Sequence, residues 1–201
     1  PAPRLFGGID LVLRDRYLLL SALLAILLNW INSTGEFILA DYVKIDAAAR
    51  IAASGGALDM GTLIAAFYGD FQFWVTLISL GIQLFLVSRI FQMVGVRGAL
   101  LIHPILVALG YGVLALAPLL GGFVPIFTLI RLIKIGENSV DYSLMNTTRQ
   151  ALFLPVDRDS KYDGKTAIDT FFWRCGDLIQ ALAIYVGLNH LHWDAPRFAL
   201  M

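Results

Sequence analysis

Residues 123–155 read FVPIFTLIRLIKIGENSVDYSLMNTTRQALFLP, a stretch long and apolar enough to cross a bilayer as a helix. Charged residues nevertheless fall inside it at intervals of three, three and four: Arg131, Lys134, Glu137 and Asp141. At about 100° per residue, these intervals place them within roughly a third of the helix circumference. Each charge would cost about 2.5–3.5 kcal/mol against lipid. The pattern predicts a helix whose charged face is turned to protein partners or to a water-filled cavity.

The composition around this stretch is that of an integral membrane protein. Of the 201 residues, 58% are hydrophobic and 15% are charged, whereas a soluble domain has about 45–50% and 25%. Several continuous apolar runs are longer than the roughly 18 residues that a membrane helix needs. We therefore predict an all-α, polytopic membrane helix bundle. The net charge is zero, which gives no reason to expect a nucleic-acid partner.

We expect five transmembrane helices and the start of a sixth in a single membrane domain, residues 1–201. The expected spans are 17–42, 66–90, 99–119, 123–150 and 166–190. Residues 43–65 are rich in alanine and glycine and are expected to form a loop with a short interfacial helix. Asp194-Ala195-Pro196 looks like the beginning of the sixth span. Because the chain begins at Pro1 rather than at a methionine, we also expect a fragment of a longer protein.

The lysine and arginine residues of the connections predict the orientation of these spans. Nine of them lie before the first span and after the second and fourth, whereas two, Lys44 and Arg50, lie in the alternate connections. Positive charge concentrates on the cytoplasmic side of membrane proteins. We therefore expect a cytoplasmic N-terminus, a first span that runs outward and a fourth that runs inward.

The first span carries a second polar stripe, at helical spacing: Asn29, Asn32, Ser33 and Glu36. The asparagines alone are typical of hydrogen bonding between membrane helices, and Glu36 could snorkel to the interface. Because the first and fourth spans run in opposite directions, Glu36 could also meet Arg131 at a similar depth.

Internal neutralisation is the alternative to a binding role for these charges. In the fourth span, Lys134 would then pair with Glu137 or Asn138, and Arg131 with Glu36. In the fifth span, Arg174 and Asp177 are three residues apart. We predict that they form a structural ion pair, with a ligand role as the alternative.

No motif in the chain is typical of an enzyme. The sequence lacks GxSxG, HExxH, a cysteine cluster and a Walker-type loop. Its single cysteine, Cys175, excludes a disulfide within the chain. We predict a protein that is not an enzyme and that has neither a cofactor nor a metal site.

Residues 142–169 read YSLMNTTRQALFLPVDRDSKYDGKTAID. This segment resembles the characteristic run of the ATP/ADP translocase family of nucleotide transporters, which belongs within the major facilitator superfamily. The matching positions, including an arginine further on, are Tyr142, Ser143, Leu144, Thr148, Pro155, Asp157, Lys161, Gly164, Lys165, Ile168, Asp169 and Arg174. Residues 29–37, NWINSTGEF, are similar to the family helix that brings an acidic residue after an asparagine-rich turn.

The chain departs from the family run at one segment. The family reads Asp-Pro-Thr-Lys-Glu where this chain reads Asn146-Thr147-Thr148-Arg149-Gln150, so Arg149 keeps the basic position and both acids are lost. The chain therefore looks like a divergent bacterial member. Residues 88–100, SRIFQMVGVRGAL, are similar to the loop between the second and third helices of a facilitator half.

The resemblance implies the C-terminal lobe of a facilitator-type transporter in a bacterial inner membrane. Such a protein would move an anionic solute, such as a nucleotide, by alternating access, with an N-terminal lobe or another membrane chain as partner. The alternative is a non-transporting membrane subunit that acts as a scaffold or helper. The candidate substrate-binding residues are Asn32, Glu36, Arg131, Lys134, Glu137, Asp141 and Arg149.

Overall fold

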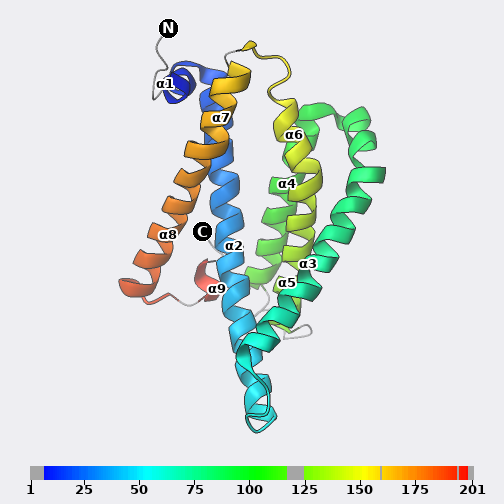
Figure 1. The fold of residues 1–201 in the computed structure, drawn as a ribbon, viewed down its shortest axis with the longest axis vertical. Helices are drawn as coiled ribbons and strands as arrows, with labels where there is room; N and C mark the ends of the chain where they lie inside the picture. Colours follow the sequence, from blue (N-terminus) through cyan, green and yellow to red (C-terminus); the bar gives the residue numbers. More distant parts are fainter. Residues whose placement is uncertain (1–6, 117–124, 159, 194, 199–201) are drawn as a thin grey trace. The chain divides into compact units, whose positions relative to one another are not determined.

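The computed structural model describes residues 7–116, 125–158, 160–193 and 195–198, and every regular element in these ranges is a helix (Figure 1). The predicted all-α bundle is confirmed. The α-helices are α1 (Gly7–Arg14), α2 (Arg16–Ala53), α3 (Met60–Phe85), α4 (Val87–Leu116), α5 (Ile126–Val140), α6 (Asn146–Ala151), α7 (Lys165–Ala167), α8 (Trp173–Asn189) and α9 (Ala195–Phe198). Between them lie the π-helical turns Asp141–Met145, Ser160–Gly164 and Ile168–Phe172.

Helical stretches of the described residues that are long and apolar enough to cross a membrane are Arg16–Ala53, Met60–Phe85, Val87–Leu116 and Ser160–Asn189. The chain is therefore that of a multi-pass membrane protein. The remaining expected span, 123–150, corresponds to the helical run from α5 through the π-helical turn to α6. This run is not among the helices that are apolar enough to cross a membrane by composition, because it contains several charged residues.

The expected loop at residues 43–65 has the wrong bounds, since only residues 54–59 lie outside helices. Helix α2 continues through the alanine-rich segment to Ala53, because alanine is the strongest helix former. The turn that follows is short and contains Gly55 and Gly56, whose φ values of 66° and 86° suit glycine at a helix C-terminus. Asp59 then caps α3 by accepting a 2.8 Å hydrogen bond from the Thr62 N–H. The bonds from Thr62 lower the pKa of this carboxyl group.

The connection expected at residues 89–98 is also largely helical. Helix α4 begins at Val87 and is interrupted at Gly95, where φ is 66° and ψ is −175°. Glycine reaches this backbone conformation at little cost, so the interruption stays within one residue. The expected break at 118–125 falls outside the described residues except for Pro125, which immediately precedes α5. The start of a sixth span stays a prediction.

The chain divides into two compact units. The first unit comprises residues 1–34 and 149–193, and the second comprises residues 35–148 and 194–201. A hydrophobic core joins α1, the first half of α2, α7 and the segments before and after α7 in the first unit: Val12, Leu18, Ala22, Ala25, Phe153, Ala167, Ile168 and Phe172.

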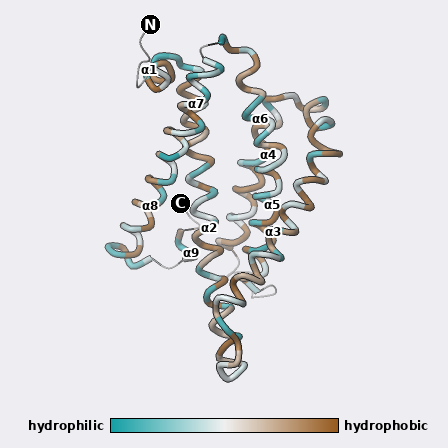
Figure 2. Tube along the Cα trace, viewed as in Figure 1, coloured by the Kyte–Doolittle hydropathy of each residue, from teal (hydrophilic) through white to brown (hydrophobic). Residues whose placement is uncertain are grey.

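In the second unit, α5 is packed against both α3 and α4. A smaller core forms there from Val87, Ala99 and Leu144. Hydrophobic residues also run along α3 and α4 (Figure 2), and many of them are exposed, such as Phe73, Leu84, Leu101 and Leu109. Since exposed apolar faces on membrane helices suit lipid tails, the inner charges of α5 are the unusual feature of this unit.

Candidate binding site

A buried lysine on α5 is the centre of the candidate site. The side chains of Lys134 and Glu137 are fully buried, and their Nζ and Oε1 atoms are 3.0 Å apart. Glu36 of α2 approaches the same ammonium group, with its Oε1 atom 3.4 Å from Lys134 Nζ. One ammonium group is therefore shared between two carboxylates that come from different helices.

Hydrogen bonds hold both carboxylates in place. The Tyr111 hydroxyl, on α4, donates to Glu137 Oε2 at 2.9 Å. The Asn138 Nδ2 atom donates to Glu36 Oε1, also at 2.9 Å. We refer to Glu36, Tyr111, Lys134, Glu137 and Asn138 as the Lys134 cluster. It connects α2, α4 and α5 within the second unit.

Close approach of α2 to this cluster depends on Gly35. A Cβ atom at this position would overlap the Tyr111 hydroxyl and would lie 3.0 Å from Lys134 Cδ. An alanine would thus displace one of the two side chains. The glycine next to Glu36 is therefore required for the geometry that brings Glu36 to the lysine.

The two carboxylates differ in access. Glu137 is fully buried, whereas 38% of the Glu36 side chain is exposed. The buried Asn138 Oδ1 atom has no hydrogen-bond partner among the described residues. When all three charged groups of the cluster are ionised, it carries one more negative than positive charge. The exposed Glu36 is the group that a ligand could replace.

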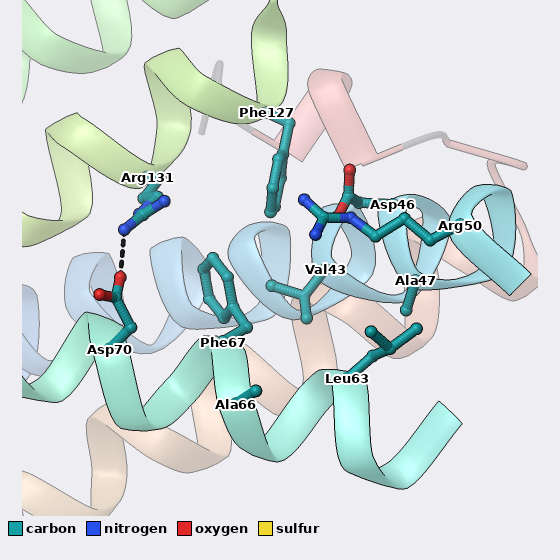
Figure 3. A pocket seen from close by; sticks show the side chains of 10 residues that line it. All are labelled: Val43, Asp46, Ala47, Arg50, Leu63, Ala66, Phe67, Asp70, Phe127 and Arg131. Carbon is teal, nitrogen blue, oxygen red and sulfur yellow. Dashed lines mark hydrogen bonds and ion pairs between the residues drawn. The ribbon is translucent and has the colours of Figure 1, made fainter. Parts of the chain in front are cut away.

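Arg131 does not join Glu36, so that hypothesis is wrong. Its guanidinium group pairs instead with Asp70 of α3 (Figure 3) and lies 5.7 Å from the centre of the Phe67 ring. Helix α5 packs closely on α3, and Arg131 is one helical turn from Lys134, on the side towards α3. Asp70 is not among the predicted site residues, although a lone carboxylate in an apolar span is a signal of function.

The other predicted site residues are not members of the Lys134 cluster as defined above. Asp141 is 9% exposed and begins the π-helical turn after α5. Asn32 and Arg149 belong to the first unit. There the Arg149 guanidinium lies 4.5 Å from the centre of the Trp173 ring. The structure therefore brings together Glu36, Lys134 and Glu137 of the predicted set.

Arg174 and Asp177 form an ion pair in the first unit, with 2.9 Å between Nη1 and Oδ2. Asp177 Oδ1 also accepts hydrogen bonds from Asn29 Nδ2 at 2.7 Å and from the Ser33 hydroxyl at 3.3 Å. Gly176 allows α2 to approach, since a Cβ there would lie 2.8 Å from the Ile26 carbonyl oxygen. These contacts fasten α8 to α2. In the part of the chain that the structure describes, no group of His, Cys, Asp and Glu side chains could hold a metal ion.

An all-helical membrane chain with a buried, shared cation inside a span has the features of a solute carrier rather than of a membrane anchor. Residues 61–188 match the family model described as "TLC ATP/ADP transporter", and the chain belongs to this family. The predicted resemblance to ATP/ADP translocases is confirmed. Because the family is one of transporters, it also supports the prediction that the protein is not an enzyme.

Curated relatives point the same way. "ADP,ATP carrier protein 1" of Chlamydia pneumoniae is 28% identical over 124 residues, which cover 55% of this chain and 24% of the relative. The protein of the same name from Chlamydia trachomatis serovar D is 27% identical over 134 residues, which cover 56% of this chain and 24% of the relative. The matched part is thus about a quarter of the length of these relatives. No solved structure matches the chain.

Proposed function

We propose that this chain is part of a transporter in a bacterial inner membrane that moves an anionic solute, a nucleotide in the first instance, by alternating access. The observation that carries the proposal is the fully buried Lys134, shared between a buried and an accessible carboxylate. Membership of the ATP/ADP transporter family supports a nucleotide as the solute.

The geometry suggests how an anion would enter the cluster. The nitrogen–oxygen distance from Lys134 is longer to Glu36 (3.4 Å) than to Glu137 (3.0 Å). Of the two carboxylates, only that of Glu36 is partly exposed. A phosphate oxygen could therefore replace Glu36 at the ammonium group while Glu137 stays in place, held by Tyr111 and Lys134. Asn138 Nδ2 would then be available as a second donor. Replacement of one anion by another avoids leaving the lysine buried without a counter-charge, which is the costly state.

Arg174 supports the presence of a further lobe or chain. It lies in the middle of the apolar stretch 160–189, and its side chain is 82% exposed. A guanidinium group at the centre of a membrane is stable only against protein or water. The interface between the two lobes of a facilitator-type transporter would supply both.

The test is uptake of radiolabelled ATP and ADP by proteoliposomes that contain the full-length protein. We expect Lys134→Gln to abolish uptake, because the cation that would bind the phosphate is lost. Lys44→Gln is the matched control: it removes an exposed lysine from α2 and should leave uptake unchanged. Thermal unfolding of each purified variant separates a loss of binding from a loss of folding.

Two outcomes would contradict the proposal. The first is uptake by a folded Lys134→Gln variant at the wild-type rate. The second is the absence of nucleotide binding to the wild-type protein together with loss of a co-purifying membrane partner in the variant. That second result would favour the scaffold or helper subunit instead.

A further inference from the structure

A pocket of about 230 Å³ lies among α2, α3 and α5 in the second unit (Figure 3). It is separate from the Lys134 cluster, since it shares no residue with it. Its walls carry four charged and two aromatic side chains: Asp46, Arg50, Phe67, Asp70, Phe127 and Arg131. The volume is below the roughly 300–1,000 Å³ of sites that enclose a whole small-molecule ligand. A smaller chemical group is therefore the better fit.

The charges of the pocket balance within two ion pairs. Arg50 Nε is 2.7 Å from Asp46 Oδ2, and Arg131 pairs with Asp70. All four side chains are partly exposed, from 32% for Asp46 to 61% for Arg50. The pocket thus offers accessible groups of both signs and no net charge. This suits a ligand with one anionic and one cationic group, and it does not suit a nucleotide with several negative charges.

The aromatic wall favours the cationic group. The Phe67 and Phe127 rings are 5.4 Å apart between centroids, and Arg131 already lies over Phe67. A ring face attracts ammonium as well as guanidinium groups. A ligand ammonium could therefore contact an aspartate and a ring together.

The pocket lies at one end of the membrane-spanning helices. It is lined by four of the first eleven residues of α3, by two residues near the beginning of α5 and by four residues in the last part of α2. Helix α3 has 26 residues, which at 1.5 Å per residue make it about 39 Å long, longer than the roughly 30 Å hydrocarbon core. About 9 Å of the helix exceeds that thickness, so the Leu63 end of the pocket can reach the level of the lipid headgroups, whereas Asp70 lies deeper.

We propose that this pocket binds the headgroup of a zwitterionic phospholipid with a primary ammonium group, as in phosphatidylethanolamine. The arginines would bind the phosphate and the aspartates would accept hydrogen bonds from the ammonium. A choline headgroup has the same charges but no N–H donor, and a glycerol headgroup has the phosphate without the cation. The carboxylates therefore predict discrimination among these lipids.

The experiment is native mass spectrometry of the detergent-purified full-length protein with matched concentrations of phosphatidylethanolamine, phosphatidylcholine and phosphatidylglycerol. We expect the ethanolamine lipid to be preferred, and the double variant Asp46→Asn, Arg50→Gln to reduce that preference by roughly fivefold, the upper end for an exposed ion pair. The matched control is Asp10→Asn, Arg14→Gln, which removes an exposed pair of the same residues at the same spacing.

A second variant tests the pocket without changing its charges. Ala66 is exposed and lines the pocket, so Ala66→Phe should fill it and reduce the lipid preference to the same extent. Equal binding of the three lipids by the wild-type protein would overturn the proposal, as would a preference that survives both variants. Displacement of the lipid by an equal concentration of free phosphoethanolamine would show that the source of the headgroup is soluble, and would overturn the lipid assignment.

Discussion

Two ion pairs with the same spacing have different surroundings in the two units. Lys134–Glu137 and Arg174–Asp177 are both three residues apart on a helix, with nitrogen–oxygen distances of 3.0 and 2.9 Å. The first pair is fully buried, whereas Arg174 and Asp177 are 82% and 36% exposed. The spacing along the helix therefore allows each pair to form. The packing around the pair determines how much free energy of unfolding is lost when one partner is removed.

The neighbours of the two pairs extend this difference. Asp177 accepts bonds from Asn29 and Ser33 and thereby holds α2 against α8, a structural role. Lys134 has a second carboxylate, Glu36, that is partly exposed. In the function proposed above, Glu36 would be the carboxylate that gives up its place at the ammonium group to the anion.

The largest expected effect is on stability, and it should separate the two pairs. Lys134→Ala leaves Glu137 buried without its cation and should lower the free energy of unfolding by about 3–5 kcal/mol. Arg174→Ala removes an exposed partner and should cost about 0–1 kcal/mol. Thermal unfolding in detergent measures both. Equal losses would show that the burial difference has no energetic consequence.

Removing both members of the buried pair should recover most of that loss. A double variant, Lys134→Met with Glu137→Leu, replaces two buried charges by apolar side chains of similar size, a change that is often neutral or stabilising. We expect it to regain about 2–4 kcal/mol relative to Lys134→Ala, yet to transport nothing. A stable double variant with normal nucleotide uptake would assign the pair to stability alone.

Part of this comparison could be predicted from the sequence. The i, i+3 spacing indicated both ion pairs. The polar residues within 29–36 indicated that α2 is the helix that contacts each pair. Sequence spacing defines which residues share a face of one helix. It does not define which neighbour that face meets, so Arg131 was assigned to Glu36 although α3 supplies Asp70.

The same limit applies to burial and to helix ends. Lys134 and Arg174 are both basic residues in the middle of a span, and only tertiary packing makes one 0% and the other 82% exposed. The extension of α2 to Ala53 was indicated by alanine propensity, but glycines at 55 and 56 within the same segment favoured a loop over all of residues 43–65.

A smaller effect is expected from the hydrogen bonds that orient the two carboxylates. Tyr111→Phe removes the 2.9 Å bond to the buried Glu137 and should cost about 1–3 kcal/mol, because the carboxylate oxygen is left without its donor. Ser33→Ala removes a 3.3 Å bond to Asp177, whose other donors remain, and should cost about 0.5 kcal/mol. Chemical denaturation of the two variants in the same detergent compares them.

If Ser33→Ala cost more than Tyr111→Phe, the polar contacts of the first unit would contribute more to stability than those of the Lys134 cluster. The comparison does not depend on transport, so it can be made on purified protein without any solute. Each substitution removes a single hydroxyl group, which keeps the change in packing small.

A small effect on stability, but the most informative result for function, is expected from Glu36→Gln. Because Glu36 is partly exposed and its Oε1 atom is 3.4 Å from Lys134 Nζ, losing its charge should cost at most about 1 kcal/mol. If Glu36 competes with the solute for Lys134, the substitution should lower the apparent KM for nucleotide, by up to about fivefold on the same energy scale. Asp177→Asn, the corresponding change in the first unit, should leave KM unaltered. A KM that rises in Glu36→Gln would show instead that this carboxylate helps to hold the solute, and Glu36 would then be a ligand rather than a competitor.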